Sequence, residues 1–147
     1  MTDSVTPLPP NRETRIRDSF ARQTMMTTLG VTILDLGVGS CVLSAPVAPH
    51  LLQQHGAAHA ALAFALGDSA AGYAALSTMA DGAEVMTVEM KINLLSPALG
   101  DRLEAVGEVS RAGRRLTVVR AEVFAVSGAA RKPVALLQGT MIPVEPG

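Results

Sequence analysis

The segment that most constrains the fold is "QQHGAAHAALAFALGDSAAGYAAL", residues 53–76, a run of small and apolar residues with one acid, Asp68. On a helix, the residues three, four and seven positions from Asp68 share its face, and both this face and the opposite one are apolar. A helix that is apolar all round is buried on all sides. The simplest way to bury it is to wrap an antiparallel sheet around it. The small residues indicate a close approach, either to sheet backbone or to the matching helix of a second subunit.

The carboxylate of Asp68 is unusual in such a segment. Ionised and unpaired, it would cost several kcal/mol on burial, so it needs hydrogen-bond donors, a shifted pKa or a cleft that holds water. Carboxylates of this kind are enriched at active sites. Nearby backbone amides or Ser69 offer a structural explanation instead, and the residues alone leave both interpretations open.

The rest of the chain predicts one α+β domain. Residues 1–11 are polar and contain proline, and we expect a disordered tail there, followed by a single domain over residues 12–147. Residues 12–30 have the pattern of an amphipathic helix that ends near Gly30. Residues 30–47 are β-rich up to Pro46, and a loop leads from there to the long helix.

The C-terminal half changes to a period of two. In "VMTVEMKINLLSP", residues 85–97, apolar side chains alternate with polar ones, which predicts a half-buried strand. Residues 101–111, 114–128 and 132–144 predict three further strands. Their short connections indicate an antiparallel meander.

Charge and cysteine content exclude several classes of function. The net charge is −1, which gives no electrostatic case for binding nucleic acid or an anionic membrane. The one cysteine, Cys41, cannot form an intramolecular disulfide, so we expect a reducing compartment, the cytoplasm.

The N-terminus lacks the pattern of a signal peptide. Residues 56–76 are long enough to cross a membrane, but a central Asp costs about 2.5–3.5 kcal/mol on insertion scales, so we expect no membrane span.

Two histidines, His55 and His59, have the i, i+4 spacing that can bind zinc. No Cys or third His lies beside them in the segment, and Asp68 lies about 13 Å beyond His59 along a helix, too far to share a metal within one chain. We therefore expect no metal. A simpler role for His59 is that of an N-terminal helix residue bonded to backbone.

These segments, taken in order, resemble the PaaI-type acyl-CoA thioesterases of the hotdog fold, from about Ile16 to Val144. In that family a His-Gly-Gly turn precedes an Asp or Glu by nine residues, the spacing of His59 and Asp68. "TVEMKINLLSPA" is similar to the family's strand after the helix, and "GRRLTVVRAEVFA" and "VALLQGTMIPV" are similar to its last two strands. The resemblance implies an α+β hotdog fold, an antiparallel sheet wrapped around a long central helix, here with an extra N-terminal helix.

The resemblance also implies the site residues. Asp68 would be the catalytic carboxylate, which either attacks the thioester carbonyl or activates a water. The backbone N–H of Ala60, just after His59, would bind the carbonyl oxygen. Gln53 would help to bind or orient the thioester, and Thr87 would orient the water, although its alignment needs a one-residue insertion in the preceding turn. The family's His-Gly-Gly is His-Ala-Ala here, a change that keeps the backbone donor.

General chemistry agrees with these roles. Thioester hydrolysis develops negative charge on the carbonyl oxygen, and free N–H groups at a helix N-terminus suit that charge. A carboxylate in an apolar setting is a stronger base than one in water, and the reaction requires no cofactor.

The N–H of Ala60 and the carboxylate of Asp68 lie about 12 Å apart along one helix, so one thioester cannot contact both. The oxyanion hole of one subunit should therefore face Asp68 of another, in a dimer or a dimer of dimers, which is a homotetramer.

The basic turn "RAGRR" contains Arg111, Arg114 and Arg115. These guanidinium groups could bind the phosphates of CoA, or the turn could be an ordinary solvated hairpin.

The leading hypothesis is an acyl-CoA thioesterase whose partners are acyl-CoA and further copies of itself. The alternatives are a non-catalytic hotdog module that binds acyl-CoA or fatty acyl groups, which the presence of Gln53 and Asp68 opposes, and a hotdog dehydratase with a histidine base. The sequence does not determine the acyl group.

Overall fold

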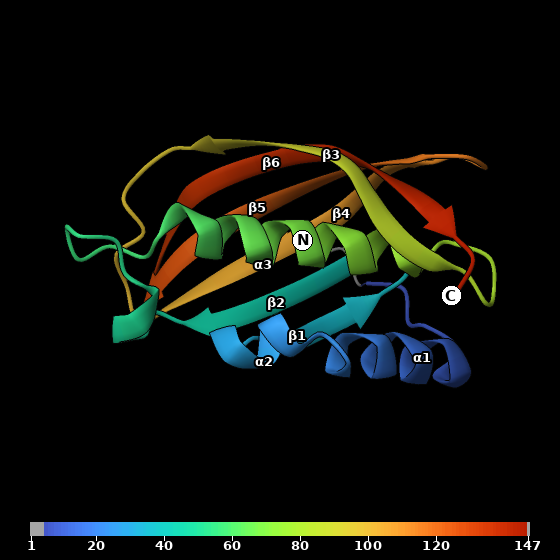
Figure 1. The fold of residues 1–147 in the computed structure, drawn as a ribbon, viewed down its shortest axis with the longest axis horizontal. Helices are drawn as coiled ribbons and strands as arrows, with labels where there is room; N and C mark the ends of the chain where they lie inside the picture. Colours follow the sequence, from blue (N-terminus) through green and yellow to red (C-terminus); the bar gives the residue numbers. More distant parts are fainter. Residues whose placement is uncertain (1–4, 147) are drawn as a thin grey trace.

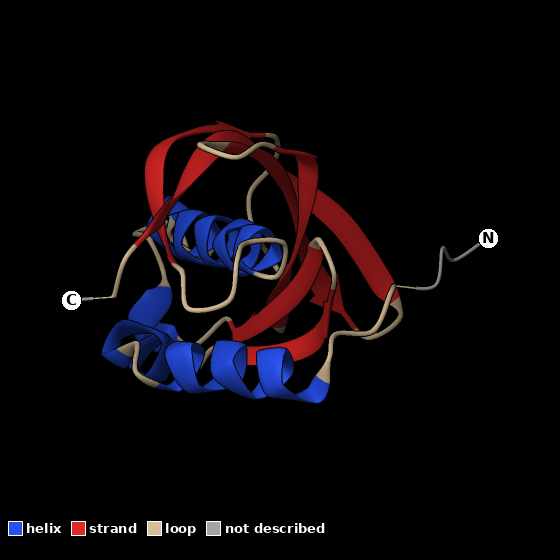
Figure 2. Cartoon of the chain, turned by 90° about the vertical axis from the view of Figure 1, so that its right-hand side faces the viewer, coloured by secondary structure: helices blue, strands red, loops and turns tan. Residues whose placement is uncertain are grey.

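The computed structural model describes residues 5–146, which form a curved antiparallel sheet around one long helix, α3 (Ala60–Leu76). Figure 1 shows α3 running across the concave side of the sheet. Figure 2 looks at the molecule end-on and shows the strands curving around α3, with α1 (Pro10–Ala21) below it. The predicted α+β architecture, a sheet wrapped around a central helix, is confirmed.

The six strands are β1 (Thr32–Gly37), β2 (Ser40–Pro46), β3 (Glu84–Leu94), β4 (Arg102–Ala112), β5 (Thr117–Ser127) and β6 (Ala130–Val144). Their spatial order is β1-β2-β4-β5-β6-β3, and all neighbours are antiparallel. The β-rich region before the long helix is thus a hairpin, β1–β2, followed by a short 3-10 helix, η1 (Pro49–Leu51).

The expected meander is correct for β4, β5 and β6, but β3 does not join it at β4. Instead β3 pairs with β6 and forms the edge of the sheet. Residues 95–101 cross the end of the sheet to reach β4, and the N–H of Ala58 donates to the carbonyl of Ala98 there (2.9 Å). Because β3 is an edge strand, one of its sides carries no neighbouring strand among residues 5–146.

Small residues let α3 approach the sheet closely. A β-carbon on Gly107 of β4 would collide with the backbone of Ala70 and Ala71 in α3. Leu66 and the alanines of the second half of the helix are fully buried. Of the two close approaches that the sequence allowed, the chain therefore makes the one to sheet backbone.

One side of α3 is nevertheless open, so the prediction of a helix buried all round is wrong for the single chain. We call Ala61, Phe64, Ala65 and Asp68 the open strip of α3. Ala61 and Phe64 are exposed, the latter by 37%, and Ala65 and Asp68 are half-buried. The strip is open because the sheet curves around only part of the helix.

The N-terminal region forms two helices where the sequence predicted one. Helix α1 ends at Ala21, and α2 (Thr24–Leu29) begins after a break at Arg22 and Gln23. The predicted end near Gly30 is confirmed, since Gly30 follows α2 in the left-handed conformation (φ 72°) that favours glycine. No helix of the described residues is long and apolar enough to cross a membrane.

The expected disordered tail, residues 1–11, does not hold for the part that is described. Residues 1–4 lie outside the described residues. The carbonyl of Thr6 accepts a hydrogen bond from the N–H of Val38 (2.9 Å), Leu8 is buried, and α1 already begins at Pro10. Two prolines start this helix where an N–H would have no partner, which explains why a proline-rich sequence is ordered.

The apolar side chains of β3 are more exposed than the predicted half-buried alternation. Met86 and Val88 are 58% and 57% exposed, whereas Met90 and Ile92 are half-buried. A β-bulge between Thr87 and Glu89 interrupts the alternation. The exposed end of β3 therefore combines an unpaired edge with apolar side chains.

Candidate active site

Asp68 lies in the middle of α3, on its open strip, and Thr87 of β3 faces it. The hydroxyl of Thr87 donates to Oδ1 of Asp68 at 2.8 Å and also lies 3.2 Å from the sulfur of Met141. The bulge in β3 follows Thr87 directly, and bulges of this kind change the direction in which a side chain points. The structure thus brings together two residues that the sequence had proposed for one site.

Burial raises the pKa of Asp68, and the hydrogen bond from Thr87 opposes that rise. Desolvation disfavours the charged form, whereas a donor to the carboxylate favours it. The result is a carboxylate that is a stronger base than one in water and is held in one orientation. Both properties suit a nucleophile or a general base.

A cavity of about 160 Å³ opens beside Asp68 and Thr87. Sequence reasoning missed the residues of its far wall, which are Ser19 and Gln23 from the N-terminal region, Tyr73 from α3 and Glu84 from β3. Of these residues, Tyr73 is the one whose place in the sequence could have predicted a polar wall. A buried tyrosine usually finds a hydrogen-bond partner for its hydroxyl, so a tyrosine in an otherwise apolar helix predicts polar residues opposite it.

The N-terminus of α3 forms a second site made largely of backbone groups. His59 is the N-cap residue, and its Nδ1 accepts a hydrogen bond from the N–H of Ala61 at 2.9 Å, which agrees with the simpler role expected for it. The N–H of Ala60, the first helical residue, makes no hydrogen bond with any described residue. This donor is available to an external acceptor.

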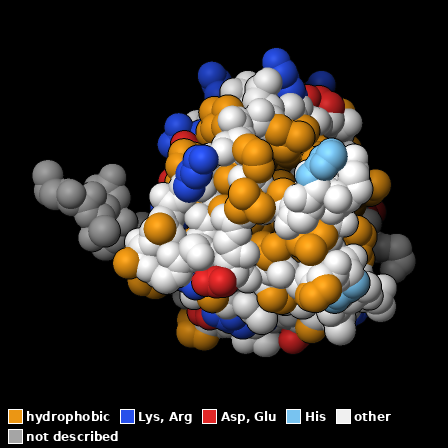
Figure 3. Space-filling view, turned by 90° about the vertical axis from the view of Figure 1, so that its left-hand side faces the viewer, with side chains coloured by type: hydrophobic (Ala, Val, Ile, Leu, Met, Phe, Trp, Pro, Cys, Tyr) orange, Lys and Arg blue, Asp and Glu red, His pale blue; other side chains and the backbone are white. Residues whose placement is uncertain are grey.

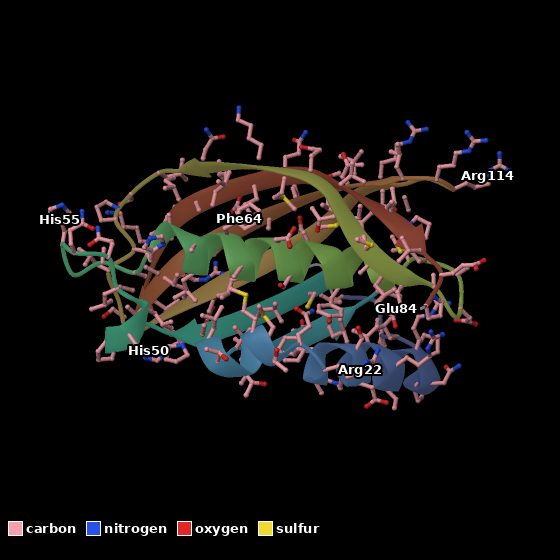
Figure 4. The ribbon with its side chains drawn as sticks, viewed as in Figure 1. Arg22, His50, His55, Phe64, Glu84 and Arg114 are labelled. Carbon is pink, nitrogen blue, oxygen red and sulfur yellow. The ribbon has the colours of Figure 1, made fainter. Side chains whose placement is uncertain are left out.

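Gln53 supports the loop before this helix end. Its side-chain oxygen accepts hydrogen bonds from the N–H groups of His55 and Ala57, and its own N–H donates to the carbonyl of Ala57 at 2.8 Å. The side-chain oxygen of Gln53 is therefore occupied, whereas its NH₂ group makes no hydrogen bond to a described residue and can donate to a ligand. His55 itself lies at the tip of the loop, away from the helix (Figure 4).

Gln53 and Ala60 line a groove of about 390 Å³, together with Ala63 and residues of the β3–β4 connection. Figure 3 looks onto this end of the molecule and shows hydrophobic side chains gathered around two histidines. Three exposed leucines belong to this end: Leu94, Leu95 and Leu99. The groove is thus mainly apolar, with polar groups at one side.

The chain does not bring the two sites together. Asp68 lies eight residues after Ala60, about 12 Å along the helix axis. The cavity beside Asp68 and the groove beside Ala60 share no lining residue. We refer to them below as the acid half-site (Asp68 and Thr87) and the amide half-site (Gln53, His59 and Ala60).

The three arginines of the basic turn lie apart from both half-sites. Arg111, Arg114 and Arg115 are exposed at the β4–β5 hairpin and make no ion pair with any described residue. Figure 4 shows Arg114 at the end of the molecule opposite His55. Their guanidinium groups are free to bind an anion.

Comparisons with known proteins show what this chain is similar to. Residues 55–131 match the model of a family described as the thioesterase superfamily. The chain is 34% identical over 114 residues to a Deinococcus radiodurans protein that is provisionally named an esterase, a match that covers 77% of this chain and 74% of that protein.

Two solved structures are similar over most of their length. A thioesterase family protein from Silicibacter pomeroyi is 41% identical, with a TM-score of 0.89 and coverage of 92% of this chain and 99% of that one. A point variant of PaaI, a phenylacetic acid degradation protein from Thermus thermophilus, is 31% identical, with a TM-score of 0.71 and coverage of 83% and 100%. The resemblance to PaaI-type proteins seen in the sequence is therefore confirmed.

Proposed function

Because this chain belongs to the thioesterase superfamily and is a thioester hydrolase, we propose that its substrate is an acyl-CoA and that Asp68 is its catalytic carboxylate. The observation that carries the proposal is the hydrogen bond between Thr87 and Asp68 beside a cavity, on a helix that is otherwise apolar. An acid placed there has a high energetic cost, and catalysis explains why that cost is tolerated.

Asp68 has two routes to hydrolysis. As a nucleophile, a carboxylate oxygen attacks the thioester carbonyl, CoA leaves as the thiolate, and water hydrolyses the resulting mixed anhydride. As a general base, it removes a proton from a water that attacks the carbonyl directly. In both routes the hydroxyl of Thr87 fixes one carboxylate oxygen and leaves the other free to react.

The amide half-site would stabilise the negative charge that develops on the carbonyl oxygen. The free N–H of Ala60 points from the N-terminus of a helix of 17 residues, where the helix dipole also favours negative charge. The free NH₂ group of Gln53 lies on the same groove and is a second donor for the thioester.

The active site would be shared between two copies of the chain, because one thioester cannot span the two half-sites of a single chain. The open strip of α3 and the exposed apolar edge of β3 both support this arrangement. If two copies lie antiparallel across a two-fold axis, Ala60 of one copy approaches Asp68 of the other. A dimer is the smallest such assembly, and a dimer of dimers stays a prediction, as does the cytoplasmic location.

The antiparallel arrangement also gives the basic turn a role. The hairpin with Arg111, Arg114 and Arg115 lies at the opposite end of the chain from the amide half-site (Figure 4). In an antiparallel dimer, the hairpin of one copy therefore lies toward the amide half-site of its partner. There its guanidinium groups would bind the phosphates of CoA.

A panel of acyl-CoAs tests the proposal by the release of free thiol, with Asp68→Asn as the inactive control. We expect turnover of at least one substrate by the native chain. Binding of acyl-CoA without turnover by the native chain would instead indicate a non-catalytic module.

Mixing Asp68→Ala with Gln53→Ala subunits tests the shared site. After random exchange in an equal mixture, about a quarter of all sites combine a native Gln53 with a native Asp68 and should be active. No recovery in a mixture that has exchanged subunits would exclude sharing.

A further inference from the structure

Met141 is a buried methionine of β6 that lies against the residue holding Asp68 and has no part in the proposed reaction. It is fully buried and stands directly opposite Thr87 in the antiparallel pair of β3 and β6. Its sulfur lies 3.2 Å from the hydroxyl of Thr87, whose other partner is Oδ1 of Asp68 at 2.8 Å. We infer that Met141 is a positioning residue, whose sulfur accepts the hydroxyl proton of Thr87 when Asp68 is protonated and so stabilises the acid form of that carboxyl. The inference rests on the proposed role of Asp68 and adds a residue that controls its ionisation.

The fold holds the sulfur of Met141 in this place. Side chains of directly opposite residues on antiparallel strands point to the same face of the sheet, so Met141 and Thr87 both face α3. A β-carbon on Gly72, one helical turn after Asp68, would lie 3.8 Å from the terminal methyl of Met141. The side chain of Met141 therefore reaches from the sheet to the helix, and the sulfur lies between its two ends, beside Thr87.

The protons available decide when the sulfur is used. The hydroxyl of Thr87 has one proton to donate and lone pairs that accept. When Asp68 is ionised, its carboxylate can only accept, so the proton of Thr87 goes to Oδ1 and the sulfur receives none. When Oδ1 gains a proton from water, it donates that proton to the oxygen of Thr87, and the hydroxyl proton of Thr87 rotates toward the sulfur. No bond of Thr87 breaks, and the sulfur accepts in the acid form alone.

Removal of the sulfur should therefore affect one ionisation state and not the other. Without it, the hydroxyl proton of Thr87 has no acceptor in the acid form, and a buried donor without a partner is costly. The ionised form loses no hydrogen bond, so the pKa of Asp68 should fall. The acid form also belongs to the general-base route, in which Asp68 takes a proton from the attacking water and returns it to the leaving thiolate.

Other groups that titrate beside Asp68 do not contact the sulfur. Glu84 and Tyr73 are the titratable residues that line the same cavity, and neither makes a hydrogen bond with Thr87 or Met141 among the described residues. Strands β2, β4 and β5 also pack against α3 but contribute no residue to this cavity. A change at Met141 should therefore act on Asp68 through Thr87.

A ¹³C NMR titration of the side-chain carboxyl carbon of Asp68 tests the inference without a substrate. Met141→Leu keeps the volume of the side chain and removes the sulfur, and the midpoint should fall by about 0.5 pH unit. Burial alone predicts the opposite sign, because leucine is no more polar than methionine and would leave the midpoint unchanged or raise it. The matched control is Met90→Leu, a half-buried methionine of β3 that packs against the core, which should keep the native midpoint. Asp68→Asn identifies the signal.

A double substitution tests whether the effect passes through Thr87. In a Thr87→Val background there is no hydroxyl to relay the proton, so Met141→Leu should leave the midpoint of Asp68 unchanged. The same fall in both backgrounds would show that Met141 acts by packing and would overturn the inference. An unchanged or raised midpoint in Met141→Leu alone, or an equal fall in Met90→Leu, would also overturn it.

The release of free thiol separates this inference from the proposed function. In an active enzyme, the low-pH midpoint of kcat/KM should fall in Met141→Leu by the same amount as the NMR midpoint. A midpoint that falls as expected in a chain without turnover overturns the proposed function alone, whereas an unshifted midpoint in an active enzyme overturns the inference alone. Each midpoint is measured within one preparation, so it does not change when part of a variant fails to fold.

Discussion

The acid half-site and the amide half-site are built from different kinds of groups. The acid half-site depends on two side chains, Asp68 and Thr87, which meet across α3 and β3. The amide half-site depends on the backbone N–H of Ala60, which any residue except proline supplies at that position. The acid half-site should therefore respond to the identity of its side chains, and the amide half-site to backbone geometry and to the residues that hold it.

Replacement of the acid should have the largest effect. Asp68→Asn keeps the shape of the side chain but removes the nucleophile and base, so we expect kcat to fall by about 10³-fold. The release of free thiol measures this loss. A variant with more than a tenth of native kcat would show that the acid half-site is not the catalytic one.

The same substitution should stabilise the fold near neutral pH. Burial raises the pKa of Asp68 above its ordinary value of 3.8, so in the interval between the two values the native state holds the proton more tightly than the unfolded chain. The unfolding free energy therefore falls as pH rises through that interval. Asp68→Asn lacks this fall, and thermal unfolding at pH 3 to 8 should show a smaller decline than in the native chain.

Ala60→Pro should have the second-largest effect. Ala60 is the first residue of α3, where proline is tolerated, and His59 before it has the extended backbone (φ −61°, ψ 142°) that a following proline requires. The substitution removes one N–H and little else, and loss of an oxyanion donor costs about 10²- to 10³-fold in kcat. Ala60→Gly is the control and should keep kcat within about threefold, because glycine supplies the same N–H. Equal activity of the two variants would exclude the N–H of Ala60 as the donor.

Gln53 has two possible roles, to hold the loop through its side-chain oxygen and to bind the thioester through its NH₂ group, and two substitutions separate them. Gln53→Ala removes both the acceptor that holds the loop and the donor that faces the groove, whereas Gln53→Glu keeps the acceptor for His55 and Ala57. If the donor binds the thioester, both variants should lose about 10²-fold in kcat/KM. If Gln53 only holds the loop, Gln53→Glu should retain native activity. The kinetics of the two variants, measured beside their thermal unfolding, decide between the roles.

Thr87→Val should change the pH dependence more than the maximal rate. The hydrogen bond from Thr87 lowers the pKa of Asp68, so its removal should raise that pKa further. The activity that appears on deprotonation of Asp68 should then appear at higher pH than in the native enzyme. Loss of one hydrogen bond to a charged group corresponds to about tenfold or more in kcat/KM at low pH. An unchanged pH midpoint would show that Thr87 does not control the ionisation of Asp68.

The contrast also explains which parts of the site the sequence could predict. Helix α3 contains Ala60 and Asp68 and is capped by His59, so helix geometry fixes the spacing of these three residues. The family motif that they resemble therefore lies within one short stretch of sequence. The place of Thr87 in the site came from the resemblance alone, and its hydrogen bond to Asp68 was not predicted, since the bulge that positions Thr87 has no signature in the alternation of β3.

Long-range contacts account for what the sequence missed. Ser19 and Gln23 meet Tyr73 across 54 and 50 residues, and only the docking of the N-terminal region onto α3 brings them together. The same holds for the place of β3 in the sheet, because alternation identifies a strand but not its neighbours. The sheet around a central helix could be predicted, since an all-apolar helix has few other ways to be buried.

His59 should have the smallest effect on catalysis, although it lies beside the proposed oxyanion donor. Its Nδ1 caps α3 by accepting from the N–H of Ala61, so His59→Ala should destabilise the fold by about 1 kcal/mol, or about 3 °C in Tm. His59→Ser restores a cap and should recover most of that stability. Both variants keep the N–H of Ala60, and kcat should stay within about threefold of the native value. A large loss of kcat in His59→Ser, with native stability, would show that the imidazole contacts the substrate and that the amide half-site also depends on a side chain.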